Sequence, residues 1–264
     1  MKIQRFVLVN LNALFPQLYP AFRLLTKGAY LRSIFEFYKD YLKYIALDKK
    51  IKSPFKVNIL NTHPIYFDRY DEAGSILQHY FHQDIWAAAK VFKSGVKTHY
   101  DIGSRLDGFI SHCLAFTKVV MLDIRPLDKK IQNLSFIQTD GTNMKNIKSN
   151  TISSISSLHA IEHFGLGRYG DPIDPLGYKK AIDEIKRVTK KGGNIYFSVP
   201  IGKQRLEFNN QRVFNPKYVM ELFSGMKLKE FSLVDDNNNF VSNVKPEKYV
   251  KVSYSCGLFH FQKP

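Results

Sequence analysis

Residues 98–109 read THYDIGSRLDGF and residues 118–124 read KVVMLDI, and together these two stretches decide the fold. The first begins as a short strand that ends at Asp101 and turns at Gly103, and the second is a strand of buried character that ends at Asp123. The residues between them are expected to form a helix. A strand, a helix and a second strand in this order form the unit from which parallel sheets are built.

The same alternation continues toward the C-terminus. Further strands are predicted at residues 135–141, 151–159, 194–200, 228–236 and 252–261, with helices at 177–193 and 215–225. In the second helix Asn215 is expected as the N-cap, Pro216 in the first turn and Gly225 as the stop. The last two strands are expected to pair antiparallel. We therefore predict an α/β fold, a Rossmann-like, doubly wound, mostly parallel sheet of seven strands with an antiparallel closing strand.

Residues 1–55 are predicted to form an N-terminal helical extension ahead of a domain at residues 56–264. Ile34, Phe35 and Tyr38 begin an apolar stripe at helical spacing. We interpret the extension as an accessory layer packed on the core, with a membrane-surface or partner-binding role as the alternative. No run of about 18 apolar residues is present, and no cleavage site follows an apolar segment, so neither a spanning helix nor a signal peptide is expected.

Composition favours a folded, cytoplasmic protein. The chain has 264 residues, 44% of them hydrophobic, and two cysteines, which we expect to be reduced core residues. Its net charge of +16 would attract nucleic acid, anionic lipid or phosphorylated small molecules. Since no zinc-knuckle, RRM or KH signature accompanies that charge, nucleic-acid binding is not favoured.

The two acidic strand ends indicate where a nucleoside-containing cofactor would bind. In doubly wound sheets, ligands bind beyond the carboxyl ends of the strands. Asp101 ends the first strand and Gly103 lets the backbone pass close to a ligand, while Asp123 follows about 20 residues further on, the spacing at which dinucleotide folds place a ribose-binding carboxylate.

The glycine pattern of the first loop is incomplete, and this favours a particular cofactor. A pyrophosphate needs G-x-G-x-x-G, but here the second glycine is Arg105 and the third is Gly108. S-adenosylmethionine has a ribose and an adenine but no phosphate, and its ammonium group would interact favourably with a carboxylate near Asp101. The departure of this loop from the glycine pattern therefore favours S-adenosylmethionine over NAD.

Five segments resemble successive motifs of class I S-adenosylmethionine-dependent methyltransferases. They are YDIGSRLDGF, VVMLDIRP, FIQTDGTNM, SLHAIEHFGLGRYGDPIDP and GGNIYFSVPIG, within a resemblance that runs from about residue 75 to about residue 235. The segment HYFHQDIWAAAKVF, together with the fourth motif, resembles one subfamily that was long described as a domain of unknown function and that occurs among bacterial surface-polysaccharide genes. The resemblance implies a methyltransferase acting in capsule or surface-polysaccharide synthesis, including on a capsular phosphoramidate group.

The resemblance also implies roles for single residues. Asp101 and Gly103 would line the methionine part of the cofactor, Asp123 the ribose, Asp140 the adenine, and His159 the sulfonium. The neighbouring cofactor-binding residues would be Ser104, Arg105, Ile124 and Gly141. The arginine at position 105 stands where the family pattern has a glycine.

The stretch LHAIEHFGLGRYGDPIDP at residues 158–175 contains H-x-x-E-H, the signature of inverted zinc peptidases. That site requires both histidines on one helix face. Here the motif follows a strand pattern and precedes three closely spaced glycines, so we reject the peptidase interpretation. His159 is expected at the strand end, with Glu162 and His163 opening a loop that faces the acceptor. The alternative is that Glu162 and His163 cap the following helix.

The acceptor determines which residues the chemistry needs. A sugar hydroxyl needs a general base, for which His163, Glu162 and Asp171 are the candidates. A phosphate or phosphoramidate oxygen is already anionic and needs cations instead. Three arginines on the loops around the expected pocket, Arg168, Arg205 and Arg212, could supply them.

A helix before the first strand is expected to border the cofactor mouth. There Tyr80, Gln83 and Asp84 are candidate substrate-binding residues, with plain packing as the alternative for Tyr80. His79 and His82 lie three residues apart, but no further ligands cluster in the sequence, so no metal site is predicted.

Together these observations predict a cytoplasmic S-adenosylmethionine-dependent O-methyltransferase. Its substrate would be a small anionic or nucleotide-linked glycan, methylated on a sugar hydroxyl or on a phosphate or phosphoramidate group. The alternatives are a catalytically silent binding module with the same fold and an RNA methyltransferase. The N-P-P-[YF] tetrad of many base aminomethylases is absent after the fourth strand, which lowers the RNA alternative.

Overall fold

The computed structural model describes residues 29–51, 54, 57, 60, 62, 64–65 and 78–264. The chain divides into two compact units, residues 1–75 and 76–264, and each is described by itself. The domain boundary predicted after residue 55 falls where only single residues are described, so it stays a prediction. The part of the predicted helical extension before Ala29 lies outside the described residues.

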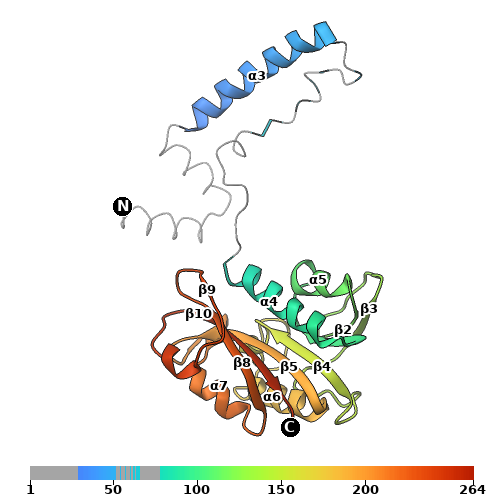
Figure 1. Ribbon diagram of the computed structural model, residues 1–264, viewed down its shortest axis with the longest axis vertical. Coiled ribbons are helices and arrows are strands. Elements are labelled where there is room, and N and C mark those ends of the chain that lie inside the picture. The colour runs from blue at the N-terminus through green and yellow to red at the C-terminus, as the bar shows by residue number, and fades with distance from the viewer. Residues whose placement is uncertain are drawn as a thin grey trace. The chain divides into compact units, whose positions relative to one another are not determined.

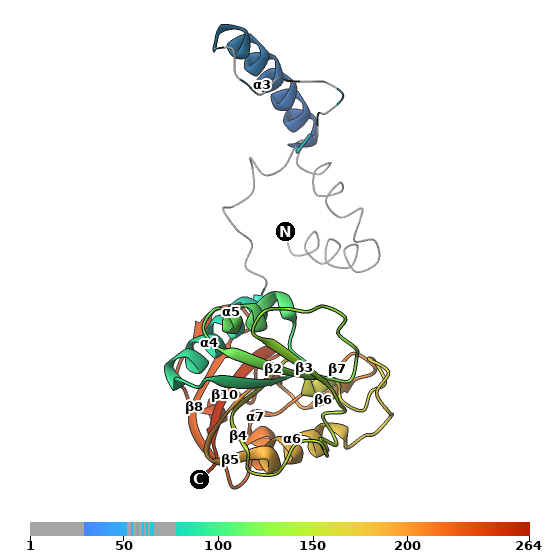
Figure 2. The same ribbon diagram turned by 90° about the vertical axis from the view of Figure 1, so that its right-hand side faces the viewer.

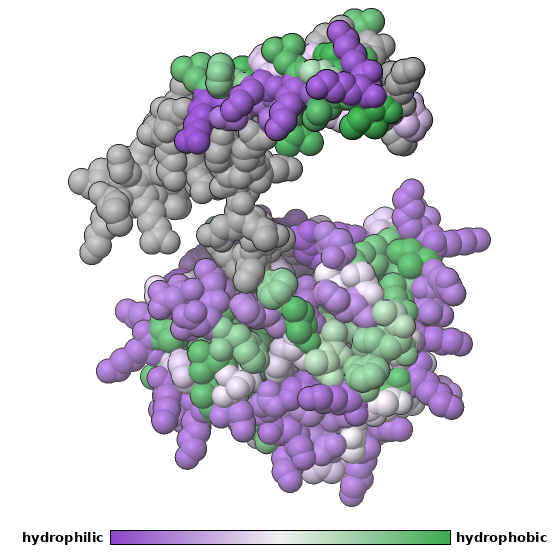
Figure 3. All heavy atoms as spheres, turned by 45° about the horizontal axis from the view of Figure 1, so that its top comes forward, coloured by the Kyte–Doolittle hydropathy of each residue, from purple (hydrophilic) through white to green (hydrophobic). Residues whose placement is uncertain are grey.

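The described helix of the first unit is α3 (Ala29–Ile51), which agrees with the helical spacing of this stretch. Leu31, Phe35 and Leu42 of this helix are exposed, and Figure 3 shows both hydrophilic and hydrophobic side chains along it. Among the described helices, none combines the length and the apolar character needed to cross a membrane.

The second unit is built on one eight-stranded sheet, in the order β3-β2-β1-β4-β5-β10-β8-β9 (Figures 1 and 2). The strands are β1 (Thr98–Ile102), β2 (Lys118–Asp123), β3 (Leu134–Gln138), β4 (Ile152–Leu158), β5 (Thr189–Ile201), β8 (Lys227–Val234), β9 (Phe240–Val241) and β10 (Ser255–Gln262). Strands β1 to β5 are parallel, whereas β10 runs antiparallel between β5 and β8. The predicted doubly wound sheet with an antiparallel closing strand is therefore confirmed.

Two small elements add to the seven predicted strands. One is the short edge strand β9, which pairs with β8. The other is a hairpin of β6 (Arg205–Glu207) and β7 (Gln211–Val213), which forms a sheet of its own. The hairpin follows β5 directly and, as described below, contributes to the functional site through the turn between its strands.

Helices cover both faces of the sheet (Figure 2). On one face lie α4 (Gln78–Ser94) and α5 (Ser111–Leu114), and on the other lie α6 (Gly177–Val188) and α7 (Pro216–Leu222). Successive strand residues point to opposite faces, so β5 sends Phe197 into the core under α6 and Tyr196 into the core under α4. Both cores are closed by apolar side chains, which leaves the strand ends as the place for a site.

Two predicted helices differ from the observed ones. The helix after β1 is short, because a π-helical turn (Leu106–Ile110) precedes the four residues of α5. The helix predicted to residue 193 ends at Val188. Residues 190–193 then form an irregularity between β4 and β5 in which Gly192 has φ +74°. That glycine bends a strand rather than ending a helix.

The N-terminus of α7 agrees with its prediction. The Asn215 side chain accepts a hydrogen bond from the backbone N–H of Lys217 at 2.9 Å, and Pro216 occupies the first turn. Both cysteines, Cys113 and Cys256, are fully buried, as expected for core residues, and neither forms a disulfide.

Candidate functional site

A cavity of about 540 Å³ opens at the carboxyl ends of the parallel strands. It is lined by residues from the loops that follow β1, β2, β3 and β4, at 102–105, 122–125, 139–142 and 158–160, and by residues of α4 and of the 162–177 loop. Its size falls within the roughly 300–1,000 Å³ of small-molecule sites. It lies where a doubly wound sheet binds its ligand.

Asp101 does not line this cavity, so the structure does not bring it to the predicted cofactor site. The side chain is fully buried, and it accepts hydrogen bonds from the Ser104 N–H (2.9 Å), the Ser104 hydroxyl (2.8 Å) and the Ser156 hydroxyl. Burial raises the pKa of Asp101 to about 6. The carboxyl group instead positions the loop after β1.

That loop itself agrees with the prediction, because Gly103, Ser104 and Arg105 line the cavity. Gly103 has φ +73°, and a Cβ there would lie 3.0 Å from the Cβ of Ala160. Only glycine combines that backbone conformation with so close a neighbour. Arg105 is exposed and pairs with Asp107 at 2.7 Å, so it borders the cavity from outside.

Asp123 and Ile124 line the cavity as predicted. Oδ1 of Asp123 accepts from the backbone N–H (2.9 Å) and Nε (3.0 Å) of Arg125, and Oδ2 accepts from its Nη2 (2.7 Å). A carboxylate oxygen can accept two hydrogen bonds, so Oδ2 retains one acceptor position. The arginine therefore fixes the orientation of the carboxylate without saturating it. Its guanidinium also lies 4.6 Å from the ring centroid of Tyr169.

Asp140 and Gly141 also line the cavity, at the end of β3. Oδ1 of Asp140 accepts from the backbone N–H and from the hydroxyl of Thr142, both at 2.8 Å. These contacts close a turn that holds the carboxylate at the cavity wall.

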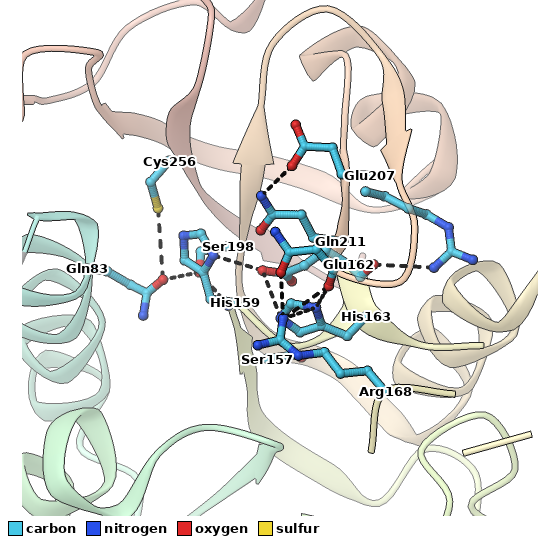
Figure 4. A network of polar contacts seen from close by, with 12 residues as sticks. Gln83, Ser157, His159, Glu162, His163, Arg168, Ser198, Glu207, Gln211 and Cys256 are labelled. Carbon is cyan, nitrogen blue, oxygen red and sulfur yellow. Dashed lines mark hydrogen bonds and ion pairs between the residues drawn. The ribbon is translucent and has the colours of Figure 1, made fainter. Parts of the chain in front are cut away.

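The residue that follows β4 is His159, in a left-handed backbone conformation with φ +48°. Its Nδ1 lies 2.8 Å from Oε1 of the fully buried Glu162. Burial disfavours a charged imidazole here, but the neighbouring Cys256 and Glu162 outweigh it and raise the pKa of His159. Among the described residues, Nε2 of His159 and Oε2 of Glu162 are buried without a hydrogen-bond partner. Figure 4 shows both side chains in the polar network that joins Gln83 to Arg168.

The H-x-x-E-H motif is not helical. His159 ends the strand segment, and Glu162 and His163 lie in a single 3-10 turn (Ile161–His163), so the two histidines share no helix face. This agrees with the rejection of a zinc-peptidase site. The alternative that Glu162 and His163 cap the next helix is wrong, because α6 begins only at Gly177 and its N-cap residue is Leu176.

His163 lies at the cavity wall in a defined tautomer. Its Nδ1 is 2.6 Å from the carbonyl oxygen of Asn210 in the β6–β7 turn. A carbonyl can only accept, so Nδ1 carries the proton and Nε2 is the basic nitrogen. Burial lowers the pKa of His163, which keeps the ring neutral. Arg168 donates to the same carbonyl at 3.1 Å and to Oδ1 of Asn210 at 2.8 Å.

Asp171 lines the cavity, but its carboxylate is committed to the backbone. It accepts from the N–H groups of Gly165 (2.6 Å), Gly167 (3.4 Å) and Tyr169 (3.2 Å). Gly165, at φ +77°, is required because a Cβ there would lie 1.9 Å from the carbonyl oxygen of Asp174. Asp171 thus shapes the loop, and the proposal of Asp171 as a general base is withdrawn for this reason.

The predicted substrate-binding residues divide into two groups. Those that line the cavity are Tyr80, Gln83, Asp84 and Arg168. Arg205 and Arg212 do not line it, so the structure does not bring them to the predicted substrate site. Arg205 pairs with Glu207 at 2.8 Å outside the cavity, and Arg212 donates to the carbonyl oxygen of Phe164 at 2.6 Å, behind the cavity wall.

The sequence reasoning missed several lining residues. They are His79, Arg125, Tyr169, Lys180, Asn210 and Tyr254. Arg125 could have been inferred, since it directly follows the predicted ribose site. Tyr254 and Asn210 carry no signal in the sequence, because only the sheet order brings their segments to this edge.

A family model described as "Caenorhabditis protein of unknown function, DUF268" matches residues 116–252. That description names no bacterial surface-polysaccharide protein, so the subfamily inferred from the sequence is not confirmed. No protein with a curated description matches the chain.

Solved structures share the fold. The 1,6-didemethyltoxoflavin N1-methyltransferase of Burkholderia thailandensis, bound to S-adenosylhomocysteine, has 13% identity and a TM-score of 0.50, with 69% of this chain and 78% of that chain covered. The N-methyltransferase NodS of Bradyrhizobium japonicum has 14% identity and a TM-score of 0.49, with 75% of this chain and 92% of that chain covered. A Bacillus halodurans protein that was assigned to the methyltransferases has 13% identity and a TM-score of 0.48, with 67% of this chain and 98% of that chain covered. The first similarity shows that the second unit has the fold of the Rossmann-like methyltransferases.

Proposed function

The chain belongs to the family described as Caenorhabditis protein of unknown function, DUF268, and we propose that it is an S-adenosylmethionine-dependent methyltransferase. The observation that carries the proposal is the carboxylate of Asp123 at the end of β2, held at the wall of a cavity of about 540 Å³. A fold alone supports many chemistries, so the function is inferred from the residues of this site.

The residues present fit the cofactor. Gly103 lets the backbone approach a ligand closely, and Oδ2 of Asp123 retains an acceptor position for a ribose hydroxyl. Asp140 uses Oδ1 for the Thr142 turn, which leaves Oδ2 to accept from an adenine amino group. Ser104, which is held by the buried Asp101 and lines the same cavity, would border the methionine part of the cofactor.

We place the acceptor between the 162–177 loop, α4 and the β6–β7 turn. When bound, S-adenosylmethionine supplies an electrophilic methyl group on sulfur. The chain's own residues then orient a nucleophilic oxygen and accept its proton. Nε2 of His163 is the group suited to that proton, because Nδ1 is committed to the Asn210 carbonyl.

An anionic acceptor has no proton to remove, so it needs positively charged residues that hold it in position. Arg168 reaches the cavity beside His163, and Lys180 and Arg125 line it as well. Lys180 pairs with Asp174 at 2.6 Å and Arg125 with Asp123 at 2.7 Å, so Arg168 is the lining arginine that best supports a substrate carrying phosphate, phosphoramidate or a nucleotide. A capsule or surface-polysaccharide precursor in a bacterium is the acceptor that the sequence resemblance favours. A cytoplasmic enzyme with reduced cysteines fits that role.

The proposal is tested by incubating the protein with a methyl-labelled donor and a panel of nucleotide-linked sugars, sugar phosphates, phosphoramidates and RNA. We expect label on a small glycan substrate and none on RNA. Label on RNA alone would support the RNA methyltransferase alternative. Absence of label from every acceptor, combined with intact cofactor binding, would support the catalytically silent binding module.

A further inference from the structure

Three soft or borderline metal ligands converge at one end of the cavity. They are His79 of α4, His159 after β4 and Cys256 of β10, and one ligand atom from each lies within 4.8 Å of the other two. The three residues come from elements far apart in the sequence, so no local turn accounts for their meeting. In Figure 4 the sulfur of Cys256 is directed toward Gln83, next to the His159 ring.

The state of His159 indicates a missing partner. Its side chain is only 5% exposed, and its Nε2 has no hydrogen-bond partner among the described residues. A buried polar atom without a partner is rare, because it loses its hydration without compensation. Nδ1 meanwhile lies 2.8 Å from the buried carboxylate of Glu162. A carboxylate on one imidazole nitrogen, with the other nitrogen free, is the arrangement that metal-ligating histidines adopt.

From these observations we propose that His79, His159 and Cys256 bind a Zn²⁺ ion. The mixed histidine and cysteine set suits Zn²⁺ better than Mg²⁺ or Ca²⁺, which prefer oxygen ligands. Tetrahedral zinc with these ligands needs donor atoms about 3.3–3.6 Å apart, so the three side chains close slightly around the ion. Cysteine binds Zn²⁺ as the thiolate.

Two of the three proposed ligands border the cavity. His79 and His159 line the cavity wall, whereas Cys256 lies behind it. Three protein ligands with an open fourth position are typical of catalytic rather than structural zinc. If the proposed methyl transfer holds, a metal held by these residues would lower the pKa of an acceptor hydroxyl that bound to it. This role rests on the proposed function, whereas metal binding itself does not.

The site differs from what the sequence suggested. His79 and His82 lie three residues apart, but the ring of His82 stacks on Phe240, with 6.0 Å between the ring centroids. The partners of His79 lie far from it in the sequence and become visible only through the sheet order. The carboxylate of Glu162 acts here as a positioning group for His159.

The test is a titration of the metal-free full-length protein with Co²⁺, a spectroscopic substitute for Zn²⁺. We expect one equivalent to produce the visible bands of tetrahedral cobalt and a thiolate-to-cobalt charge-transfer band, both removed by Zn²⁺. Cys256→Ser should lose the charge-transfer band, and His79→Ala should lose tight binding. Glu162→Gln should bind about 10–100-fold more weakly.

Matched variants separate ligation from damage to the fold. Cys113→Ser also removes a fully buried thiol, and His82→Ala removes a histidine from the same helix, and both should bind like the wild type. No cobalt bands in the wild type, or equal spectra for Cys256→Ser and Cys113→Ser, would overturn the proposal. S-adenosylhomocysteine binding is measured in parallel, because it tests the proposed function separately. If the protein binds metal but not S-adenosylhomocysteine, the metal site is supported and the methyltransferase proposal is refuted.

Discussion

At the scale of single residues, the site depends on which nitrogen or oxygen of each side chain is already occupied. The backbone carbonyl of Asn210 holds the proton on Nδ1 of His163, and Arg125 orients the carboxylate of Asp123. The sequence predicted Asp123, Asp140 and His163 at the cavity because acidic and basic residues at strand ends converge in this fold. It could not predict that Asp101 turns away, since that depends on Ser104 and on Ser156 of a neighbouring strand.

Replacing His163 with alanine tests the proton acceptor. With a hydroxyl acceptor we expect kcat to fall about 10²–10⁴-fold, because a general base contributes that much, while the dissociation constant for S-adenosylhomocysteine stays unchanged. His112→Ala, an exposed histidine outside the cavity, is the control in the same steady-state assay. An unchanged kcat on a hydroxyl acceptor would rule out the base role.

At the scale of elements, the alternation of strands and helices predicted the sheet well. Short elements were less predictable, because their ends depend on contacts between distant segments. The β6–β7 hairpin was missed, although its turn supplies Asn210 to the site, since three-residue strands leave almost no periodicity in a sequence. Helix α6 ends early, at Val188, because strand β5 begins at the next residue, Thr189.

The loop between β4 and α6 offers a test of its backbone geometry. Gly165 and Gly170 both have positive φ, at +77° and +80°, but only at Gly165 would a Cβ meet a backbone oxygen, at 1.9 Å. Gly170→Ala should lower the free energy of unfolding by about 1–2 kcal/mol, the cost of the left-handed conformation alone. Gly165→Ala should cost about 3 kcal/mol or more, since steric overlap adds to it. Urea denaturation of both variants measures this, and equal losses would contradict the loop geometry.

A histidine of β1 predicts a pH dependence of stability. His99 is fully buried between the hydroxyls of Ser154 and Ser156, each 2.8 Å away, and burial lowers its pKa to about 3. The unfolded chain binds the proton near pH 6.5 and the native chain only near pH 3, so the free energy of unfolding falls as the pH falls between these values. This contribution is complete above about pH 6.5.

We therefore compare the wild type with His99→Gln by urea denaturation at pH 7 and pH 5. Between these values the wild type should lose about 2 kcal/mol more than the variant, at about 1.4 kcal/mol per pH unit below pH 6.5. Titrating groups remote from His99 act equally in both proteins and cancel in the difference. Asp101 is joined to His99 through the Ser156 hydroxyl and titrates in this range, so both proteins also carry Asp101→Asn. A difference that is independent of pH would show that His99 does not titrate as described.

At the scale of the whole molecule, the cavity belongs to one of the two compact units. Every described residue that lines the cavity lies in the unit of residues 76–264. That unit also contains both apolar cores. The sequence distinguished these parts by the helical character of the first 55 residues.

This division predicts the behaviour of a shortened chain. Residues 76–264 alone should fold, with a single cooperative unfolding transition, and should bind S-adenosylhomocysteine with the dissociation constant of the full chain. Calorimetric titration of both proteins makes the comparison. A folded fragment that has lost binding would show that the first unit contributes to the cofactor site.

The most direct test of the central claim is a calorimetric titration with S-adenosylhomocysteine of three full-length proteins: the wild type, Asp123→Ala and Asp128→Ala. Asp128 lies exposed in the segment after the same strand and outside the cavity, so it controls for the loss of one negative charge. We predict binding of one equivalent by the wild type and by Asp128→Ala. Asp123→Ala should bind about 10–150-fold more weakly, since hydrogen bonds to a charged group are worth about 1.5–3 kcal/mol. Equal binding by all three proteins, or none by the wild type, would contradict the assignment.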